Sequence, residues 1–304
     1  MKILLFGKGG QVGWELQRSL APLGELVALD SHSTELCGDF SNPDGVAATV
    51  RQVAPDVIVN AAAHTAVDKA ESEPEFARTL NALAVGAIAQ EAEKLGAWMA
   101  HYSTDYVFDG SGTIPWTEQS PTGPLSVYGK TKLEGEQLLQ QRCSRHLIFR
   151  TSWVYAARGG NFAKTMLRLA AERDALTVID DQMGAPTGAE LLADVTALAL
   201  RQVRARGADG QGLSGLYHLA AAGETSWHGY ARFVIDFAQS KGVALKATGD
   251  AVRPVPSSAF KTVAPRPGNS RMDTRKLQAA FGVRLPHWQA GVTRMLTETL
   301  ERNT

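Results

Sequence analysis

The stretch KILLFGKGGQVG at residues 2–13 joins an apolar run of strand length to a glycine-rich turn and then to a helix. Three glycines recur at three-residue spacing directly after the apolar run: Gly7, Gly10 and Gly13. Apolar residues then follow at the spacing of one helix face: Val12, Leu16, Leu20 and Leu23. Such a turn exposes bare backbone and the free N–H groups of a helix N-terminus, where a pyrophosphate can bind. We therefore predict a dinucleotide site that includes Gly7, Gly10 and Gly13.

Short apolar runs and amphipathic helices continue to alternate through the first half of the chain. Further strand-sized runs lie at residues 26–29, 57–59, 97–103 and 147–150, and residues 36–38 also resemble a strand. Parallel strands that are buried on both faces show this pattern, so we predict an α/β fold with a Rossmann-type doubly wound parallel sheet. Residues 1–152 are assigned mainly to this domain, and segments near 189–220 are expected to rejoin it. Residues 153–304 are assigned mainly to a smaller, mixed region that closes a cleft.

The composition excludes several classes of protein. The 304 residues carry 31 Lys and Arg against 31 Asp and Glu, and 44% of residues are hydrophobic. A neutral chain has no electrostatic footprint for nucleic acid or an anionic membrane, so we expect neither partner. The first apolar run is too short for a signal segment or a membrane span. Two cysteines, Cys37 and Cys143, are too few for a disulfide framework, and we expect a reduced, cytoplasmic protein.

Polar residues follow the predicted strands where a doubly wound sheet binds its ligand. Asp30 ends the second run, where a carboxylate can accept hydrogen bonds from ribose hydroxyls. It would repel a 2′-phosphate, which favours NADH over NADPH, although a solvated loop aspartate is the alternative reading. Asp39 and Phe40 are placed to hold the adenine edge. The small residues at 60–63 would let a cofactor approach the backbone, whereas His64 is more often structural than a catalytic base.

A Tyr-x-x-x-Lys pair, Tyr128 and Lys132, lies at the start of a predicted helix. An i, i+4 pair shares one helix face, and a nearby ammonium lowers the pKa of a phenol. Tyr128 would then protonate a carbonyl oxygen while hydride reaches the carbon. The pair alone is common, but the glycine turn, Asp30 and Thr104 at a strand end make chance a poor explanation.

With these motifs, the chain resembles the extended short-chain dehydrogenase/reductase family, and within it the branch that reduces dTDP-linked 4-keto sugars. The matching stretches run nearly from end to end: residues 5–13, 60–68, 103–110, 150–155, 181–187, 215–219 and 266–273. The resemblance implies reduction of the 4-keto group of dTDP-4-dehydro-L-rhamnose to dTDP-L-rhamnose with NADPH or NADH. The product would supply rhamnose-containing cell-surface polysaccharide, such as a lipopolysaccharide O-antigen.

The resemblance also implies roles for single residues. Tyr128 would be the proton donor, Thr104 would help to hold the keto oxygen, and Lys132 would bind the nicotinamide ribose. Besides Tyr128 and Lys132, the positions that match cofactor contacts are Gly10, Gln11, Val12, Asp30, Asp39, Phe40, Ala63, His64, Thr65 and Tyr102. Those that match sugar-nucleotide contacts are Thr104, Asp105 and Trp153, and we add Asn161, Gln182 and Arg271 as plausible nucleotide contacts. Trp153 would stack on the sugar or base, or else belong to the core.

Some reductases of this family form homodimers joined through Mg²⁺ that is held by glutamates. Glu15 and Glu190 stand at matching positions, and Glu298 on the last helix is a third candidate. Hard cations prefer such carboxylates, but exposed helical glutamates are usually solvated. We expect a homodimer and consider Mg²⁺ as a second cofactor.

Three alternatives stay open on these grounds. A dehydratase of this fold commonly carries an Asp-Glu pair after the threonine, whereas Asp105 is followed by Tyr106 here. An epimerase is excluded less firmly. A non-catalytic regulatory subunit could lose Thr104, Tyr128 or Lys132, and their presence favours an enzyme.

The Gly- and Pro-rich residues 109–124 would form either a lid over the cleft or a plain surface loop.

Overall fold

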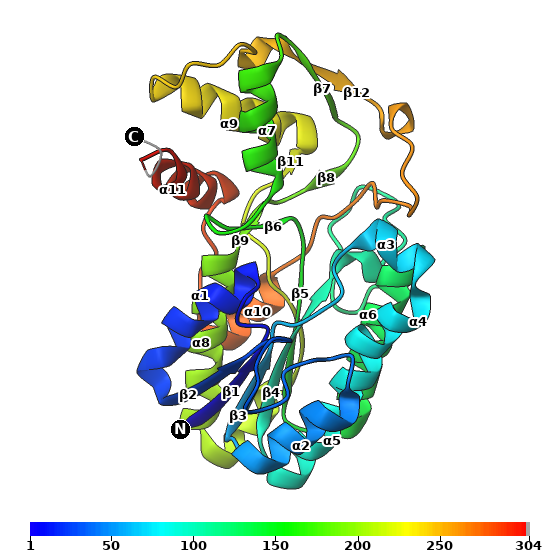
Figure 1. The fold of residues 1–304 in the computed structure, drawn as a ribbon, viewed down its shortest axis with the longest axis vertical. Helices are drawn as coiled ribbons and strands as arrows, with labels where there is room; N and C mark the ends of the chain where they lie inside the picture. Colours follow the sequence, from blue (N-terminus) through cyan, green and yellow to red (C-terminus); the bar gives the residue numbers. More distant parts are fainter. Residues whose placement is uncertain (302–304) are drawn as a thin grey trace.

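A six-stranded parallel sheet forms the larger of two lobes in the computed structural model, which describes residues 1–301 (Figure 1). The strands lie in the order β10-β5-β4-β3-β1-β2. Their bounds are β1 Lys2–Phe6, β2 Glu25–Leu29, β3 Val57–Asn60, β4 Trp98–Thr104, β5 His146–Thr151 and β10 Gly215–His218. Strand β1 pairs with β2 on one side and with β3 on the other. This confirms the predicted Rossmann-type sheet and places its ligand crevice beyond the ends of β1 and β3.

Alternation of side chains along each strand decides which helices cover which face of the sheet. Ile3, Leu5 and Val59 pack with helices α1, α8 and α10, whereas Leu4 and Phe6 pack with α2, α5 and α6. The bounds are α1 Gln11–Leu20, α8 Ala189–Ala205 and α10 Arg275–Phe281 on the first face. On the second face they are α2 Pro43–Val53, α5 Ala84–Leu95 and α6 Val127–Arg142. Both faces are thus covered, as the continuous apolar strands predicted.

The helical segment that follows β3 is interrupted. Following α3 (Val67–Ser72), the chain forms α4 (Pro74–Arg78), a π-helical turn (Thr79–Leu83) and then α5. The turn points Asn81 into the interior, where its Oδ1 accepts the His64 N–H at 2.8 Å and its Nδ2 donates to Thr131 Oγ1 at 3.1 Å. The irregularity therefore ties the loop after β3 to helix α6, as π-turns often do near functional sites.

The strand-like residues 36–38 do not form a strand, so that expectation was wrong. The Cys37 carbonyl accepts a hydrogen bond from Thr49 Oγ1 at 2.8 Å instead of entering a ladder. Gly38 lies so close to β2 that a Cβ would be 2.4 Å from the Asp30 carbonyl oxygen. The segment crosses the end of β2 rather than extending the sheet, and β2 remains the edge strand.

The smaller lobe packs three helices around its own core: α7 Phe162–Glu172, α9 Trp227–Ser240 and α11 Trp288–Glu301. A parallel pair, β7 (Leu176–Ile179) with β12 (Val252–Val255), forms its outer edge. Shorter pairs join β6 (Val154–Tyr155) to β9 (Thr187–Gly188) and β8 (Met183–Gly184) to β11 (Thr225–Ser226). Short 3₁₀ turns lie at Ala21–Leu23, Asp105–Val107, Gly207–Leu213, Gly249–Ala251 and Ser257–Ala259. From the second half of the chain, α8, β10 and α10 lie in the sheet lobe, so the lobes interleave in sequence.

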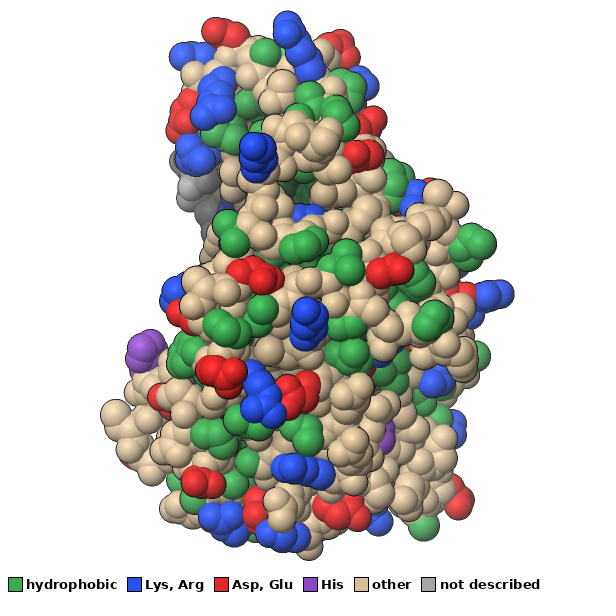
Figure 2. Space-filling view, turned by 90° about the vertical axis from the view of Figure 1, so that its right-hand side faces the viewer, with side chains coloured by type: hydrophobic (Ala, Val, Ile, Leu, Met, Phe, Trp, Pro, Cys, Tyr) green, Lys and Arg blue, Asp and Glu red, His purple; other side chains and the backbone are tan. Residues whose placement is uncertain are grey.

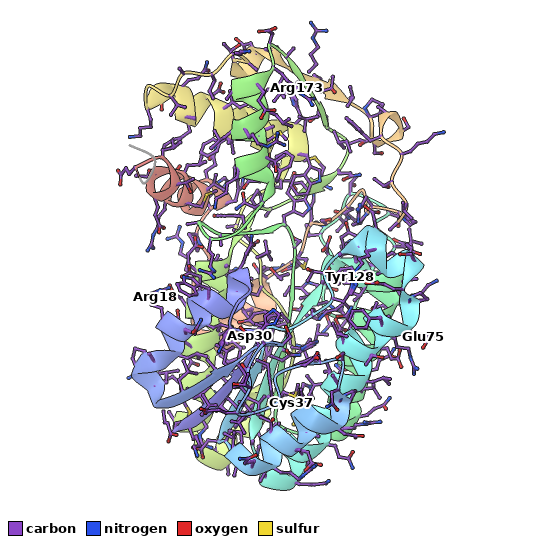
Figure 3. All side chains as sticks on the ribbon, in the orientation of Figure 1. Arg18, Asp30, Cys37, Glu75, Tyr128 and Arg173 are labelled. Atoms are coloured by element: carbon purple, nitrogen blue, oxygen red, sulfur yellow. The ribbon has the colours of Figure 1, made fainter. Side chains whose placement is uncertain are left out.

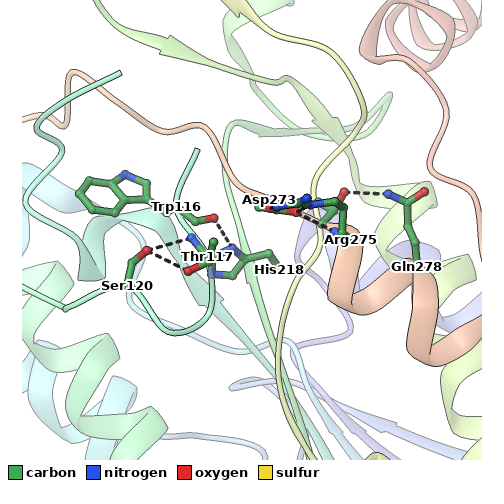
Figure 4. A network of polar contacts seen from close by, with 8 residues as sticks. Trp116, Thr117, Ser120, His218, Asp273, Arg275 and Gln278 are labelled. Carbon is green, nitrogen blue, oxygen red and sulfur yellow. Dashed lines mark hydrogen bonds and ion pairs between the residues drawn. The ribbon is translucent and has the colours of Figure 1, made fainter. Parts of the chain in front are cut away.

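Residues 109–124 are anchored to a distant part of the chain. The Trp116 carbonyl accepts hydrogen bonds from the Asp273 N–H at 2.7 Å and from His218 Nδ1 at 3.0 Å (Figure 4). The Trp116 ring stacks on Phe108 with centroids 4.6 Å apart, and its Nε1 donates to the Asn269 carbonyl. These contacts hold the middle of the segment against residues 218 and 269–273, and whether it acts as a lid over the cleft or as a plain surface loop stays a prediction.

The surface carries mixed charge on the face shown in Figure 2, where Lys and Arg are interspersed with Asp and Glu. This distribution agrees with the formal net charge of zero. No helix within residues 1–301 is both long enough and apolar enough to cross a bilayer.

A buried ion pair gives the fold a testable weak point. Arg150 of β5 and Glu136 of α6 pair at 2.6 Å with side chains only 5% and 2% exposed. Arg150→Met would leave the Glu136 carboxylate buried without its partner, so we expect the free energy of unfolding to fall by about 3–5 kcal/mol in urea titrations. The control is Glu172→Gln in the exposed Arg168–Glu172 pair, where the expected change is below about 0.5 kcal/mol. Equal effects would contradict this account.

Candidate active site

The glycine turn after β1 has no room for side chains. Gly7 has φ +86°, and a Cβ on it would lie 2.6 Å from the Ala62 nitrogen; one on Gly13 would lie 1.9 Å from the Gly7 carbonyl oxygen. Gly10 caps α1 without a side chain, so no side-chain acceptor there takes the first helix N–H groups at residues 11–13. The turn thus presents backbone donors at a helix N-terminus, which is what an anionic pyrophosphate requires.

A cavity of about 440 Å³ opens beside this turn. Among the predicted cofactor residues, it is lined by Gly7, Gly10, Asp30, Asp39, Phe40 and Ala63. Asp30 Oδ1 accepts the His32 N–H at 3.0 Å, and its Oδ2 faces Gly9 across the turn. Both carboxylate oxygens of Asp39 accept hydrogen bonds from Ser41. Asp30 is therefore better placed than Asp39 to receive a ribose.

The remaining residues of the predicted cofactor set lie around this cavity rather than in its wall. Gln11 Nε2 donates to the Gly160 carbonyl at 2.7 Å, and Val12 packs on the core. His64 is buried, and its Nε2 lies 2.6 Å from Glu73 Oε1, which is a structural contact. Thr65 is exposed next to it.

Helix α6 brings Tyr128 to the end of β4. Ser126 caps the helix by accepting the Gly129 N–H at 3.1 Å, and a Cβ on Gly129 would lie 2.2 Å from the Tyr106 carbonyl oxygen. This close approach sets the first helical turn against Thr104–Tyr106, and the Tyr128 ring meets Tyr106 edge-on with centroids 5.4 Å apart. Figure 3 shows Tyr128 and Asp30 on the sheet lobe, both at the side that faces the smaller lobe.

The electrostatics of the Tyr-x-x-x-Lys pair differ from the sequence prediction. Burial raises the pKa of Tyr128 above its usual value, Asp105 and Tyr106 add to the rise, and a hydrogen bond with Thr104 opposes it. Lys132 Nζ is turned toward β4 instead, where it donates to the Tyr102 carbonyl at 2.6 Å. Burial lowers its own pKa to about 8. The expected lowering of the phenol pKa by Lys132 was therefore wrong for this arrangement.

Thr104 and Asp105 form a buried polar pair beside Tyr128. Thr104 Oγ1 donates to Asp105 Oδ1 at 3.1 Å and accepts the Tyr106 N–H at 3.2 Å. Thr104 thus donates its single hydroxyl hydrogen bond to Asp105, and it would donate to a keto oxygen only by giving up this bond. Burial raises the Asp105 pKa to about 6, and hydrogen bonds with Ser270 and Thr104 oppose the rise.

Tyr102 does not offer its side chain to the site. Because side chains alternate along β4, its ring points to the opposite face, where the hydroxyl lies 2.7 Å from Thr196 Oγ1 of α8. Only its backbone carbonyl reaches the site, through Lys132. The cofactor contact of Tyr102 therefore stays a prediction, and only the backbone of this residue is placed to make it.

A second cavity, of about 670 Å³, lies between the smaller lobe and the end of β4. Gln182 is the predicted substrate residue in its wall, and its Oε1 accepts a hydrogen bond from Trp227 Nε1 at 3.2 Å. Trp153 has φ +49° and stacks on Trp227, with centroids 3.6 Å apart. Trp153 is half-buried and contacts the cavity wall through Trp227, and its stacking on the sugar or base stays a prediction.

Two predicted nucleotide contacts are engaged elsewhere. Asn161 caps α7 by accepting the Lys164 N–H at 3.1 Å, and its Nδ2 donates to the Ala156 carbonyl. Arg271 pairs with Glu224 at 2.6 Å and donates to Asn269. Neither side chain lines a cavity described above, so the structure does not bring them to the site.

The larger cavity also contains residues that sequence reasoning missed. Its polar and aromatic wall includes Tyr106, Phe162, Arg173, Trp227, Arg253 and Arg266. Arg266 is positioned by Asp68 at 2.6 Å and lies 3.5 Å from the Tyr106 hydroxyl. Arg266 occurs in a family-like stretch and could have been selected from it. Arg173 and Arg253 belong to no sequence motif. Only the fold brings the end of α7 close to β12, so sequence reasoning had no signal for these two arginines.

The predicted metal site is not supported. Glu15 and Glu190 lie near each other, since Glu15 contributes to raising the pKa of Glu190 after the larger effect of burial. Within residues 1–301, no group of three His, Cys, Asp or Glu side chains is arranged to hold a metal ion. Glu298 on α11 therefore does not complete a set of three with Glu15 and Glu190.

The raised pKa of Asp105 predicts a pH-dependent stability. The folded state holds this proton more tightly than the unfolded chain, so the stabilisation is complete below the ordinary pKa of 3.8 and is lost as pH rises through about 6. That difference corresponds to about 3 kcal/mol. Relative to Asp105→Asn, the wild type should lose about this much unfolding free energy between about pH 3.5 and pH 7.

The exposed Asp109 is the control, because hydrogen bonds from Ser111 lower its pKa. Asp109→Asn should change the pH dependence in the opposite direction. Urea titrations in which the wild-type and Asp105→Asn stabilities stay parallel across pH would contradict a buried, titrating Asp105.

Comparison with known proteins gives the chain its family. The model of the RmlD substrate binding domain matches residues 1–301. A dTDP-4-dehydrorhamnose reductase of Salmonella typhimurium is 63% identical over 304 residues, which is 100% of both chains. The crystal structure of a Clostridium acetobutylicum dTDP-4-dehydrorhamnose reductase superimposes with a TM-score of 0.86 at 32% identity, covering 99% of this chain and 100% of that one. One from Bacillus anthracis, in complex with NADP, gives 0.85 at 31% identity and covers 98% of this chain and 99% of that one. This chain belongs to the RmlD substrate binding domain family, together with the dTDP-4-dehydrorhamnose reductases that it resembles.

Proposed function

We propose that this protein reduces the 4-keto group of dTDP-4-dehydro-L-rhamnose to give dTDP-L-rhamnose, with NADH or NADPH as the hydride donor. The observation that carries the proposal is that helix α6 carries both Tyr128, which contacts the wall of the larger cavity, and Lys132, which is linked to the wall of the smaller one. The Tyr128 ring contacts Tyr106, which lines the larger cavity. Lys132, on the same helix, is joined through His101 and Asn60 to Ala62, which lines the smaller cavity.

The smaller cavity fits a nicotinamide dinucleotide. Gly7 and Gly13 leave the backbone bare where a pyrophosphate would lie, and the N-terminus of α1 supplies donors. Asp30 would accept hydrogen bonds from the adenosine ribose, and Lys132 would donate to the nicotinamide ribose. When bound, the dinucleotide supplies hydride to the substrate carbonyl carbon.

The larger cavity fits a sugar nucleotide. Three guanidinium groups, those of Arg173, Arg253 and Arg266, line it and would neutralise a diphosphate. Phe162 and Trp227 offer aromatic surface for the pyrimidine base. Asp105, which lies next to Thr104 and near Tyr128, would hold a sugar hydroxyl. The cavity therefore orients the keto group toward the phenol.

Tyr128 supplies the proton of the reaction. Because burial raises its pKa, the phenol keeps its proton at neutral pH. As hydride adds to C4, negative charge develops on O4; the Tyr128 O–H bond breaks and the proton passes to O4. The product is an alcohol, and the phenolate that remains is reprotonated before the next cycle.

The first test is nicotinamide oxidation with enzymatically generated dTDP-4-dehydro-L-rhamnose, followed by identification of the sugar product. Stoichiometric oxidation with dTDP-L-rhamnose formed supports the proposal. Conversion without net oxidation would indicate an epimerase, and cofactor binding without turnover would indicate a regulatory subunit. A homodimer and a cytoplasmic location stay predictions, which light scattering and cell fractionation would test.

Removal of the phenol oxygen tests the proton donor. Tyr128→Phe should lower kcat by about 10²–10⁴-fold while NADH affinity stays within about twofold, because only the transferred proton is lost. Tyr217→Phe is the matched control, since that hydroxyl donates to the Leu213 carbonyl away from the site. Steady-state kinetics and NADH titrations measure both. Unchanged turnover in Tyr128→Phe would refute the assignment.

Asp30 should set the coenzyme preference. Two carboxylates, Asp30 and Asp39, line the smaller cavity, and its wall contains no Lys or Arg among the described residues. We expect NADH to be preferred and Asp30→Ser to raise the NADPH-to-NADH ratio of kcat/KM by about tenfold or more, because a 2′-phosphate is no longer repelled. Asp39→Asn is the control, since Ser41 already occupies that carboxylate. The same ratio in wild type and Asp30→Ser would contradict this role.

A further inference from the structure

His101 of β4 lies buried between two groups of the site, although no sequence motif pointed to it. Its Nδ1 is 3.0 Å from Asn60 Nδ2, and its Nε2 is 3.3 Å from Lys132 Nζ. All three residues are at most 2% exposed. His101 faces α6 because it lies opposite Asn60 in the β3–β4 register and alternates with Tyr102, which faces α8.

The orientation of the Asn60 amide follows from a neighbouring backbone group. Asn60 Oδ1 accepts the Ala62 N–H at 2.9 Å, in the loop that touches Gly7. Turning the amide over would set an NH₂ group against that N–H and leave a backbone donor unsatisfied. The NH₂ group of Asn60 therefore points at His101 Nδ1 as a donor.

A neutral imidazole has one acceptor nitrogen and one donor nitrogen. Burial, with a contribution from Lys132, lowers the pKa of His101 well below its usual value, so the ring is neutral. Because Nδ1 accepts from Asn60, the ring proton must lie on Nε2, and this N–H points at Lys132. If Lys132 were an ammonium, its N–H groups and the His101 Nε2–H would both be donors facing each other. A neutral Lys132 amine has a lone pair that can accept the hydrogen bond from Nε2–H.

We propose that His101 is a positioning residue for Lys132: Asn60 fixes the Nε2–H tautomer, and the His101 N–H then favours the neutral amine of Lys132 over its ammonium while Lys132 donates to the Tyr102 carbonyl. Its consequence for catalysis rests on the proposed function, in which Lys132 meets the nicotinamide ribose. The charge of Lys132 then changes near pH 8.

The groups around Lys132 agree with this assignment. Burial lowers the pKa of Lys132 to about 8, and Glu136 on its own helix opposes the shift. Glu136 is itself paired with Arg150 of β5, which limits its effect on Lys132. From β4, Lys132 meets His101 and the Tyr102 carbonyl, and Tyr128 lies one helical turn before it.

Nitrogen NMR of the intact protein labelled with ring-¹⁵N histidine tests the tautomer directly. The chain has 7 histidines, and comparison with His101→Gln assigns the signal of His101. We expect a neutral ring with the proton on Nε2 and a bare Nδ1. A proton on Nδ1, or on both nitrogens near neutral pH, overturns the proposal. This readout does not depend on turnover, so a protein with this tautomer but no reductase activity would contradict the proposed function and leave this inference standing.

Asn60→Asp provides the matching functional test. One carboxylate oxygen can still accept the Ala62 N–H, while the other accepts a hydrogen bond from a proton carried on Nδ1, so Nε2 becomes an acceptor for a Lys132 ammonium. In the wild type, affinity for NADH should fall as pH rises through about 8, because Lys132 loses its charge. In Asn60→Asp the midpoint should move upward by about one pH unit or more.

The added negative charge alone would also raise the midpoint, so the comparison is repeated in a His101→Phe background, which has a ring but no nitrogens. If the tautomer transmits the effect, Asn60→Asp should shift the midpoint by less than about half as much there. An equal shift in both backgrounds, or no shift in either, overturns the proposal. If His101→Phe does not fold, the NMR measurement on the wild type still decides.

Discussion

Helix α6 lies so close to its neighbours that two of its positions have no room for a side chain. A Cβ on Gly129 would meet the Tyr106 carbonyl at 2.2 Å, and one on Gly135 would meet the Asn81 carbonyl at 2.1 Å. The helix therefore cannot rotate or slide without a clash. Because Tyr128 and Lys132 are carried on it, their positions against the ends of the strands follow from this packing. The π-turn at Asn81 serves the same contact from the other side.

A layer of buried polar side chains lies between α6 and the sheet. Ser103, Arg150 and His218 lie side by side across β4, β5 and β10, and Glu136 pairs with the arginine. Because these groups have little contact with water, burial shifts the pKa values of the titratable groups nearby. Burial keeps the proton on Tyr128 and raises the pKa of Asp105 to about 6, while it lowers that of Lys132 to about 8. A sequence motif cannot show whether each pKa is raised or lowered, since the shift depends on what surrounds the group in the folded protein.

Residues near the backbone turns were predictable, and residues that act through remote contacts were not. The glycine turn and Tyr-x-x-x-Lys are local, and the structure places them at the strand ends as expected. Asn161 and Arg271 were selected by type, but one became a helix cap and the other an ion-pair partner. His101 had no distinguishing neighbour in sequence, because its partners lie 41 and 31 residues away. Arg173 and Arg253 meet only when the smaller lobe has folded.

The amino-acid sequence alone determined the α/β class, the glycine-rich turn and the Tyr-x-x-x-Lys pair. These depend on short-range periodicity and on glycines that a tight turn requires. The tertiary structure decided which way Lys132 points, that Thr104 donates a hydrogen bond to Asp105, and which arginines share a cavity with Tyr106. Each of these depends on strand register and on burial, which arise only when segments far apart in the chain pack together and exclude water.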